Sequence, residues 1–339
     1  MRQAALAVVR LEYMARGPTR YLHRPMKSKP ALDPQFVPFI EALGKLPPLW
    51  GQSLSDARAM WDLSVFGEPE EVGAIRELEI PVAGGTMGAR LYSPSTEPTA
   101  LIVYFHGGGW VLGGLETHDL PLRALTNMTG AAVLSVDYRL APEHPFPVGL
   151  QDCYAALVWA QAWQTDLIGS VKPMLVAGDS AGGNLAAVVA LIARDRSGPE
   201  IDAQVLLYPV TDGRCSSPSF AERAEGGLLT SRDMQWFWSQ YVKDESQRED
   251  PRASPCQAAS HRNLPPALVV IAEFDPLRDE GIAYAQQLRA AGNEVTLLRY
   301  DSLPHGFINS VQTVGAAGEA LREIAQSIRA TVSSARVRG

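Results

Sequence analysis

The chain has few cysteines and no long apolar run, and both absences narrow what it can be. Its 339 residues include three cysteines, Cys153, Cys215 and Cys256, and none of them stand in a C-x-x-C spacing. A disulfide framework and a zinc site are therefore not indicated, and a reducing, cytoplasmic location is expected. No apolar stretch reaches the length that crosses a bilayer, so we expect no stable membrane insertion.

Basic residues are also fewer than acidic residues. Lysine and arginine number 30 against 37 aspartate and glutamate residues, and the formal net charge is −7 at pH 7. No basic stripe with interleaved aromatic residues is present, so nucleic-acid binding is not expected. Residues 1–25 are the exception, because they hold five arginines and one acid. Arg10 interrupts their short apolar stretch, which argues against a secretory signal. We predict a loosely ordered basic extension there, with Met26 as a candidate functional start.

From about residue 74 onward, short apolar stretches alternate with longer helical patterns. The first two stretches alternate in polarity and are linked by Gly84-Gly85, which predicts an antiparallel hairpin. The later stretches are continuous apolar runs, typical of parallel strands covered on both faces. The pattern predicts an α/β fold with a mostly parallel eight-stranded sheet flanked by helices. Predicted strands cover residues 75–81, 86–92, 101–105, 132–137, 174–178, 205–208, 267–272 and 294–300, and predicted helices cover 116–129, 148–164, 181–196, 279–291 and 312–333.

Two stretches fall outside this alternation. Residues 26–72 carry helical patterns broken by prolines, and residues 211–260 form a long insertion that contains an aromatic cluster. An insertion of that size inside a compact domain is usually functional. We predict that both stretches form a helical cap over the carboxyl edge of the sheet, where ligands bind in open α/β folds.

Two glycine-rich motifs directly follow two of the predicted strands. His-Gly-Gly-Gly occupies residues 106–109, and Gly-Asp-Ser-Ala-Gly-Gly occupies residues 178–183. Glycine abundance alone would produce G-x-S-x-G in roughly one such chain in ten, and His-Gly-Gly-Gly in roughly one in several hundred. Both motifs also stand where a strand gives way to a loop or helix. Together they indicate an acyl-transfer site.

Ser180 is the predicted nucleophile of that site. A tight strand-to-helix turn would project its hydroxyl, and the crowded backbone of such a turn favours Gly178 and Gly182 as flanking residues. The glycines after His106 leave main-chain N–H groups unobstructed, with Gly109 supporting the loop. We expect the N–H groups of Gly107, Gly108 and Ala181 to form an oxyanion hole.

Six histidines compete for the role of general base. His305 follows the last predicted strand, from which it can reach across the carboxyl edge of the sheet to Ser180. His106 stands on the wrong side of the glycines and is expected to hold their loop by hydrogen bonds. Asp275 follows the strand before His305 and is the expected orienting acid. The resulting order of serine, acid and histidine is that of the α/β hydrolases.

These motifs resemble those of the hormone-sensitive-lipase-like esterases, the bacterial family IV esterases of the α/β-hydrolase superfamily. The resemblance covers about residues 30–335 and includes Asp-Tyr-Arg-Leu-Ala-Pro-Glu at 137–143, Asp-Pro-Leu-Arg-Asp at 275–279 and His-Gly-Phe at 305–307. It implies an α/β-hydrolase catalytic domain over residues 73–210 and 261–339. It also implies hydrolysis of short- to medium-chain carboxylic esters through an acyl-serine, without metal or cofactor.

Several alternatives stay open. An amidase, a lactonase or a peptidase would use the same three residues, and a small-molecule receptor would share the fold but lack the catalytic histidine. A homodimer formed through residues 312–333 and a monomer are both compatible with the sequence. The aromatic residues of 211–260 either line the substrate pocket or form the cap's own core. The pocket candidates are Trp110, Leu228, Leu229, Trp236, Phe237 and Phe307.

Overall fold

The computed structural model of the chain describes residues 30–62 and 67–338. Within them, eight strands form one sheet in the order β1-β2-β4-β3-β5-β6-β7-β8. The strands are β1 (Ala74–Val82), β2 (Gly85–Ser93), β3 (Leu101–Phe105), β4 (Ala132–Val136), β5 (Met174–Asp179), β6 (Ala203–Leu207), β7 (Ala267–Phe274) and β8 (Val295–Pro304). β1 pairs with β2 and β2 with β4 in antiparallel fashion, and all the other pairings are parallel. The predicted hairpin and mostly parallel sheet are confirmed.

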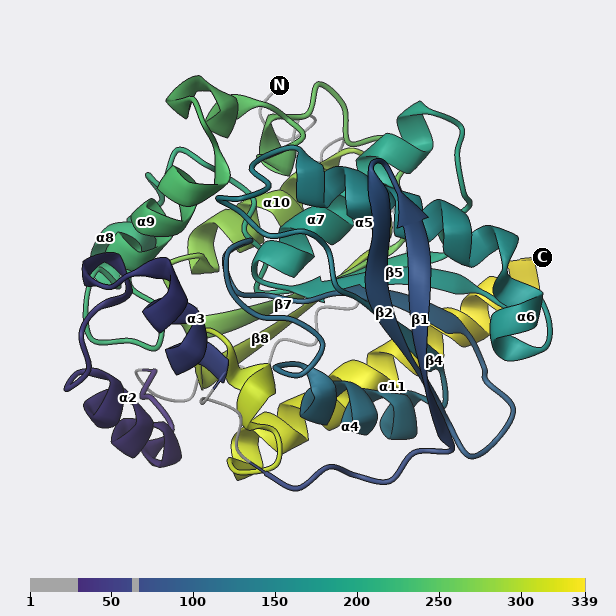
Figure 1. Cartoon of the computed structure of the whole chain (residues 1–339), viewed down its shortest axis with the longest axis horizontal. Helices are drawn as coiled ribbons and strands as arrows, with labels where there is room; N and C mark the ends of the chain where they lie inside the picture. Colours follow the sequence, from purple (N-terminus) through teal and green to yellow (C-terminus); the bar gives the residue numbers. More distant parts are fainter. Residues whose placement is uncertain (1–29, 63–66, 339) are drawn as a thin grey trace, which may run out of the picture.

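Helices cover both faces of this sheet. α5 (Val148–Ala162), α7 (Ala181–Asp195) and α10 (Arg278–Ala290) lie on one face, and α4 (Asp119–Thr129) and α11 (Gly315–Arg338) lie on the other (Figure 1). Successive side chains of β3 therefore enter two separate cores, Val103 on the α5–α7 face and Tyr104 on the α4–α11 face. Burial on both faces explains why β3, β4 and β6 are continuous apolar runs.

Several predicted boundaries need correction. The expected helix 148–164 ends at Ala162, and a separate α6 (Gln164–Ile168) follows it. The expected helix 312–333 begins at Gly315, because residues 307–310 form the 3₁₀ helix η5 (Phe307–Ser310), and it continues to Arg338. β6 ends at Leu207, since Tyr208 turns the chain away with a φ of 35°. β8 continues through Pro304, directly before His305.

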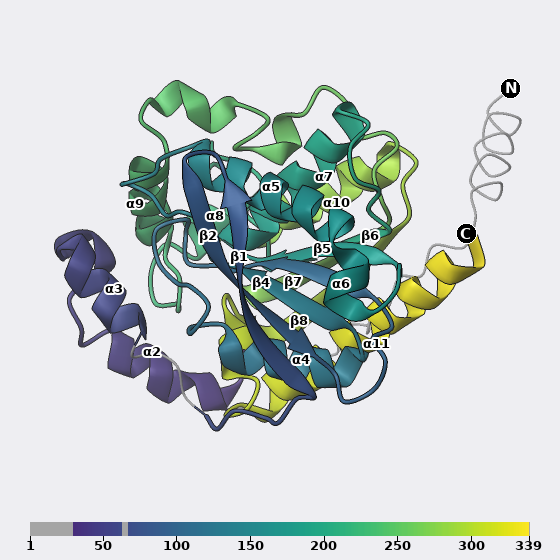
Figure 2. The same cartoon turned by 45° about the vertical axis from the view of Figure 1, so that its right-hand side comes forward.

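The two stretches outside the alternation carry short helices. α2 (Val37–Leu43) and α3 (Leu54–Asp62) come from the N-terminal stretch, and α8 (Pro218–Glu222) and α9 (Ser231–Tyr241) come from the insertion. All four lie on the same side of the molecule, at the left of Figure 1, and Figure 2 shows α2 and α3 at its margin. The same two stretches also contain short 3₁₀ helices, namely η1 (Pro34–Phe36), η2 (Leu49–Gly51), η3 (Glu245–Glu249) and η4 (Pro255–Gln257).

The N-terminal stretch and the insertion are in direct contact. Arg232 of α9 lies over the ring of Trp50 in η2, with 3.4 Å between the guanidinium carbon and the ring centroid. α9 itself starts from a capping box, in which Thr230 and Asp233 satisfy each other's backbone N–H groups. The expected basic extension, residues 1–25, lies outside the described residues.

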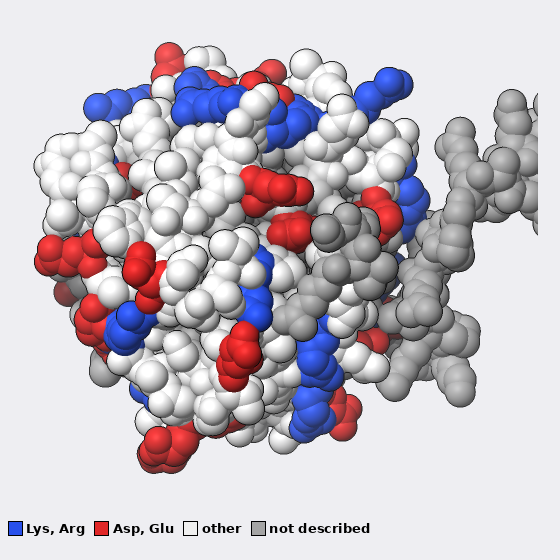
Figure 3. Space-filling view, turned by 90° about the vertical axis from the view of Figure 1, so that its right-hand side faces the viewer, with Lys and Arg blue, Asp and Glu red and all other residues white. Residues whose placement is uncertain are grey.

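The surface charge is mixed. On the face shown in Figure 3, Lys and Arg side chains alternate with Asp and Glu over a mostly uncharged surface, with no broad area of one sign. None of the helices in the described part of the chain combines the length and the hydropathy that a bilayer crossing requires.

Candidate active site

Ser180 occupies a strained turn between β5 and α7. Its φ of 55° and ψ of −118° lie outside the regions that L-residues favour. The Ser180 N–H donates to the carbonyl of Leu207 at 2.9 Å, which ties the turn to β6. A Cβ at Gly182 would collide with the carbonyl oxygen of Phe105, and a Cβ at Gly178 would collide with the backbone of Gly182. Glycine is therefore required at both flanking positions.

Ser180, His305 and Asp275 form a continuous hydrogen-bonded chain. His305 Nε2 lies 2.9 Å from Ser180 Oγ, and His305 Nδ1 lies 2.7 Å from Asp275 Oδ2. Because a carboxylate only accepts, Nδ1 carries the proton and Nε2 is free to accept from the serine hydroxyl. Asp275 Oδ1 accepts the N–H of Leu277 at 2.8 Å, and the carboxylate is fully buried. The three residues that the sequence singled out thus meet with the geometry of a nucleophile, a base and an orienting acid.

The loop of three glycines lies beside Ser180, but one expected donor is already occupied. The Gly107 N–H donates to Asp179 Oδ1 at 2.9 Å, so it cannot point at a substrate oxygen. This corrects the expectation that Gly107 is an oxyanion donor. Within the described residues, the N–H groups of Gly108, Gly109 and Ala181 have no protein acceptor. These three are the donors that remain available.

His106 holds this loop, as its position before the glycines predicts. Its Nδ1 donates to the carbonyl of Gly107 at 2.7 Å, and its ring stacks on Tyr138 with 4.3 Å between centroids. Burial, together with the nearby imidazole of His118, lowers the pKa of His106 to about 3, so the ring is neutral. A trans peptide directs its C=O and the following N–H to opposite sides. Fixing the Gly107 carbonyl therefore also fixes the direction of the Gly108 N–H.

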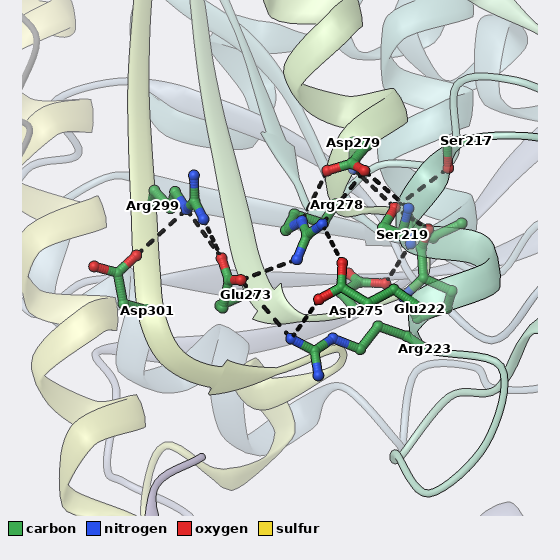
Figure 4. Close-up of polar contacts among 12 residues, drawn as sticks. Ser217, Ser219, Glu222, Arg223, Glu273, Asp275, Arg278, Asp279, Arg299 and Asp301 are labelled. Carbon is green, nitrogen blue, oxygen red and sulfur yellow. Dashed lines mark hydrogen bonds and ion pairs between the residues drawn. The ribbon is translucent and has the colours of Figure 1, made fainter. Parts of the chain in front are cut away.

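The loop that carries Asp275 is held by hydrogen bonds to α8. Ser219 Oγ donates to the carbonyl of Pro276 at 2.7 Å, and the Ser219 N–H donates to Asp279 Oδ2 at 2.8 Å. Figure 4 shows that Arg278 lies between these contacts and Glu273, with which it forms an ion pair at 2.9 Å. Further ion pairs extend the network to Glu222, Arg223, Arg299 and Asp301. The insertion is thereby joined to the strand end that presents the acid.

The pocket candidates separate into two groups. Phe237 of α9 packs against the α-carbon of Gly109, and the ring of Trp236 meets Phe237 edge to face at 5.1 Å. Leu229 is buried and Leu228 is half-buried in the segment before α9. These four residues stay candidates for the pocket.

The two remaining pocket candidates, Trp110 and Phe307, are packed against other aromatic rings. Trp110 stacks on Tyr241 at 4.1 Å and also contacts Trp238, so its ring is enclosed by α9. Phe307 is fully buried between Tyr208 and Tyr300 in the core of the α4–α11 face. Their place in the pocket stays a prediction.

Tyr208 lies beside His305 but is not among the site residues predicted from the sequence. Its ring meets the imidazole of His305 edge to face, with 4.8 Å between centroids, from a backbone with positive φ. No motif marks such a residue, because its position depends on how the chain leaves β6.

Comparison with known proteins agrees with this architecture. The model of a family described as having the alpha/beta hydrolase fold matches residues 102–309. The chain is 46% identical over 266 residues to the carboxylic ester hydrolase LipN of Mycobacterium tuberculosis, an alignment that covers 76% of this chain and 71% of that protein. It is 33% identical over 317 residues to the ethyl acetate hydrolase of Pseudomonas putida, covering 88% of this chain and 99% of that protein.

A solved structure extends the likeness to three dimensions. The hyperthermophilic esterase of the archaeon Pyrobaculum calidifontis superposes with a TM-score of 0.83 at 39% identity, covering 88% of this chain and 98% of that one. The fold is thus that of an α/β hydrolase. The chain belongs to the hormone-sensitive-lipase-like esterases of that superfamily. The family resemblance and the enzyme class predicted from the motifs are confirmed.

Proposed function

We propose that the chain hydrolyses short- to medium-chain carboxylic esters through an acyl-serine intermediate. One observation carries the proposal: the buried hydrogen-bonded chain from Ser180 through His305 to Asp275. Relatives named as ester hydrolases support the type of bond that is cleaved. The two stretches predicted as cap, residues 26–72 and 211–260, would bound the substrate.

In the first half of the reaction, Ser180 Oγ attacks the ester carbonyl while its proton passes to His305 Nε2. Asp275 holds the imidazole in the tautomer that can accept this proton and stabilises the cation that forms. The carbonyl oxygen becomes an oxyanion, and the N–H groups of Gly108, Gly109 and Ala181 are the proposed donors to it. Each such donor is typically worth about 10²–10³ in rate.

Collapse of the tetrahedral species then breaks the bond between the acyl carbon and the alcohol oxygen. His305 Nε2–H gives its proton to the leaving alcohol, and the acyl group stays on Ser180. A water molecule next attacks the acyl-enzyme, with His305 again accepting a proton, and the carboxylic acid leaves. The serine recovers its proton, so the enzyme is unchanged after each turnover.

Acyl-chain length is proposed to be limited by the aromatic side of α9. Phe237 covers Gly109, and Trp236 packs against Phe237. A long acyl chain that passes this side of the loop would have to displace a packed ring. This favours esters of short and medium chain length over long-chain lipids.

The test is hydrolysis of p-nitrophenyl esters from acetyl to palmitoyl by the wild type and by Ser180→Ala. We expect a short- or medium-chain optimum and a loss of turnover on the order of 10⁶-fold in the variant. Ser334→Ala, which removes an exposed hydroxyl on α11, is the matched control and should keep wild-type turnover. Activity that survives in Ser180→Ala contradicts the proposal. Faster turnover of the matched amide than of the ester would instead favour an amidase.

A further inference from the structure

A buried carboxylate lies between the serine turn and the oxyanion loop. Asp179, the residue before Ser180, receives three donors on the same oxygen, Oδ1. They are the Tyr104 hydroxyl at 2.8 Å, the Gly107 N–H at 2.9 Å and His118 Nε2 at 3.1 Å. Hydrogen bonds to an ionised carboxylate are roughly twice as strong as neutral ones. The three donors come from β3, from the glycine loop and from the start of α4.

His118 is fully buried and its protonation follows from its partners. Because a carboxylate only accepts, His118 Nε2 carries a proton, and the Gly107 N–H, 3.3 Å from that nitrogen, is left to Asp179. His118 Nδ1 lies 3.0 Å from Thr117 Oγ1, which is itself bonded to the backbone of Gly114. Burial acts to raise the pKa of Asp179, but its proximity to His118 holds that pKa below its ordinary value. The carboxylate is therefore anchored in its ionised form.

The contact between Asp179 and the loop leaves no spare space. A Cβ at Gly107 would collide with Asp179 Oδ2. The loop backbone and the carboxylate thus touch directly, and Asp179 directly precedes Ser180 in the chain. The position of the loop relative to the serine is set by this contact.

We infer that Asp179 is a positioning residue that fixes the oxyanion loop against the Ser180 turn, with His118 holding the carboxylate in place. The inference rests on the proposed function, because it concerns donors that only an acyl-transfer reaction uses. Gly107 directly precedes Gly108 and Gly109, so a shift of Gly107 moves two of the three proposed oxyanion donors. A displacement of 1 Å at a reacting centre can cost about 10²-fold in rate.

The experiment compares Asp179→Ala, Asp179→Asn and the control Asp202→Ala on p-nitrophenyl butyrate. Asp202→Ala also removes a carboxylate that accepts a backbone N–H, that of Met174 at 2.8 Å, but at the end of β5 away from Ser180. We expect Asp179→Ala to lose on the order of 10² in kcat with KM within about threefold of wild type. Asp179→Asn keeps an acceptor for Gly107 and should recover to within about tenfold. Asp202→Ala should stay within about threefold.

Inhibitor binding provides a readout that a purely structural role would not change. 1,1,1-Trifluoro-2-octanone adds to a serine to give an oxyanion, whereas 2-octanone hardly does so, and transition-state analogues depend on the donors of the site. The ratio of the inhibition constant of 2-octanone to that of the trifluoro ketone should fall about 10²-fold in Asp179→Ala and stay unchanged in Asp202→Ala. An unchanged ratio in Asp179→Ala, or equal losses of kcat in Asp179→Ala and Asp202→Ala, overturns the inference.

Two further variants keep the test decisive. If Asp179→Ala does not fold, His118→Ala is expected to lose about tenfold in kcat, and His118→Gln, whose amide N–H can replace Nε2–H, should restore it. No loss in His118→Ala overturns the inference. Turnover that survives in Ser180→Ala overturns the proposed function itself. An inactive Ser180→Ala together with unaffected Asp179 and His118 variants overturns the positioning role alone.

Discussion

The buried, neutral His106 predicts a specific loss of stability in acid. In the folded protein, burial and the nearby His118 lower the pKa of His106 from 6.5 to about 3. In the unfolded chain the same imidazole has its ordinary pKa. Between these two values the unfolded state binds a proton that the folded state does not. Stability is therefore complete above about pH 6.5 and is lost progressively as the pH falls toward 3.

The magnitude follows from the difference in proton binding. Each pH unit within that window costs about 1.4 kcal/mol, since the unfolded state binds one more proton. From pH 7.5 to pH 4.5, the imidazole of His106 lowers the free energy of unfolding by about 3 kcal/mol. His106→Asn removes the titrating ring, while its side-chain amide can still donate to the carbonyl of Gly107, which His106 Nδ1 contacts at 2.7 Å.

The assay is urea-induced unfolding of the wild type and His106→Asn at pH 7.5 and pH 4.5. The wild type should lose about 3 kcal/mol more than the variant over this interval, although the variant is less stable at pH 7.5 because it lacks the stacking on Tyr138. His144→Asn, which removes an exposed histidine, is the control and should follow the wild type. Equal losses in the wild type and His106→Asn would refute the reasoning.

Three further substitutions test the contacts around the site. Ser219→Ala removes the hydrogen bond to Pro276, so urea unfolding should show a free energy of unfolding that is lower by about 1–3 kcal/mol. In ester kinetics, kcat should fall by a larger factor than the factor by which KM changes. Phe237→Leu shortens the side chain against Gly109 and should move the acyl-chain optimum to longer p-nitrophenyl esters; an unchanged optimum would exclude Phe237 from the pocket. Arg58→Ala removes the bidentate ion pair with Glu143. It should lower the midpoint of thermal unfolding and speed proteolysis of the N-terminal stretch. No change in either measurement would show that this ion pair does not hold the stretch.

Residues whose placement depends on local backbone geometry could be predicted from the sequence. Gly178 and Gly182 mark a turn that any larger residue would block, and Ser180, Asp275 and His305 meet because β5, β7 and β8 end at the same edge of a parallel sheet. The sheet was predictable for the same reason, because burial on both faces leaves continuous apolar runs in the sequence.

Contacts that depend on how separate loops meet could not be predicted in this way. The occupation of the Gly107 N–H by Asp179 requires the curvature of two loops, which no local pattern encodes. The stacking of Trp110 on Tyr241 joins two residues that lie 131 positions apart in the chain. Tyr208 lies next to His305 only because its φ of 35° turns the chain out of β6.

The flexibility of glycine also explains why buried polar groups surround the glycine loop. Glycine loses more conformational freedom on folding than any other residue, and its lack of a side chain leaves it without contacts of its own. The rigidity of the loop must come from its neighbours: Asp179 and His106 hold Gly107 by hydrogen bonds from within the core, and Phe237 covers Gly109 from α9. Because the two sides act on successive peptides of the same loop, we expect losses in Asp179→Asn and Phe237→Leu to couple in a double-mutant cycle measured on kcat. Strict additivity would mean that the loop is held by its own backbone geometry instead.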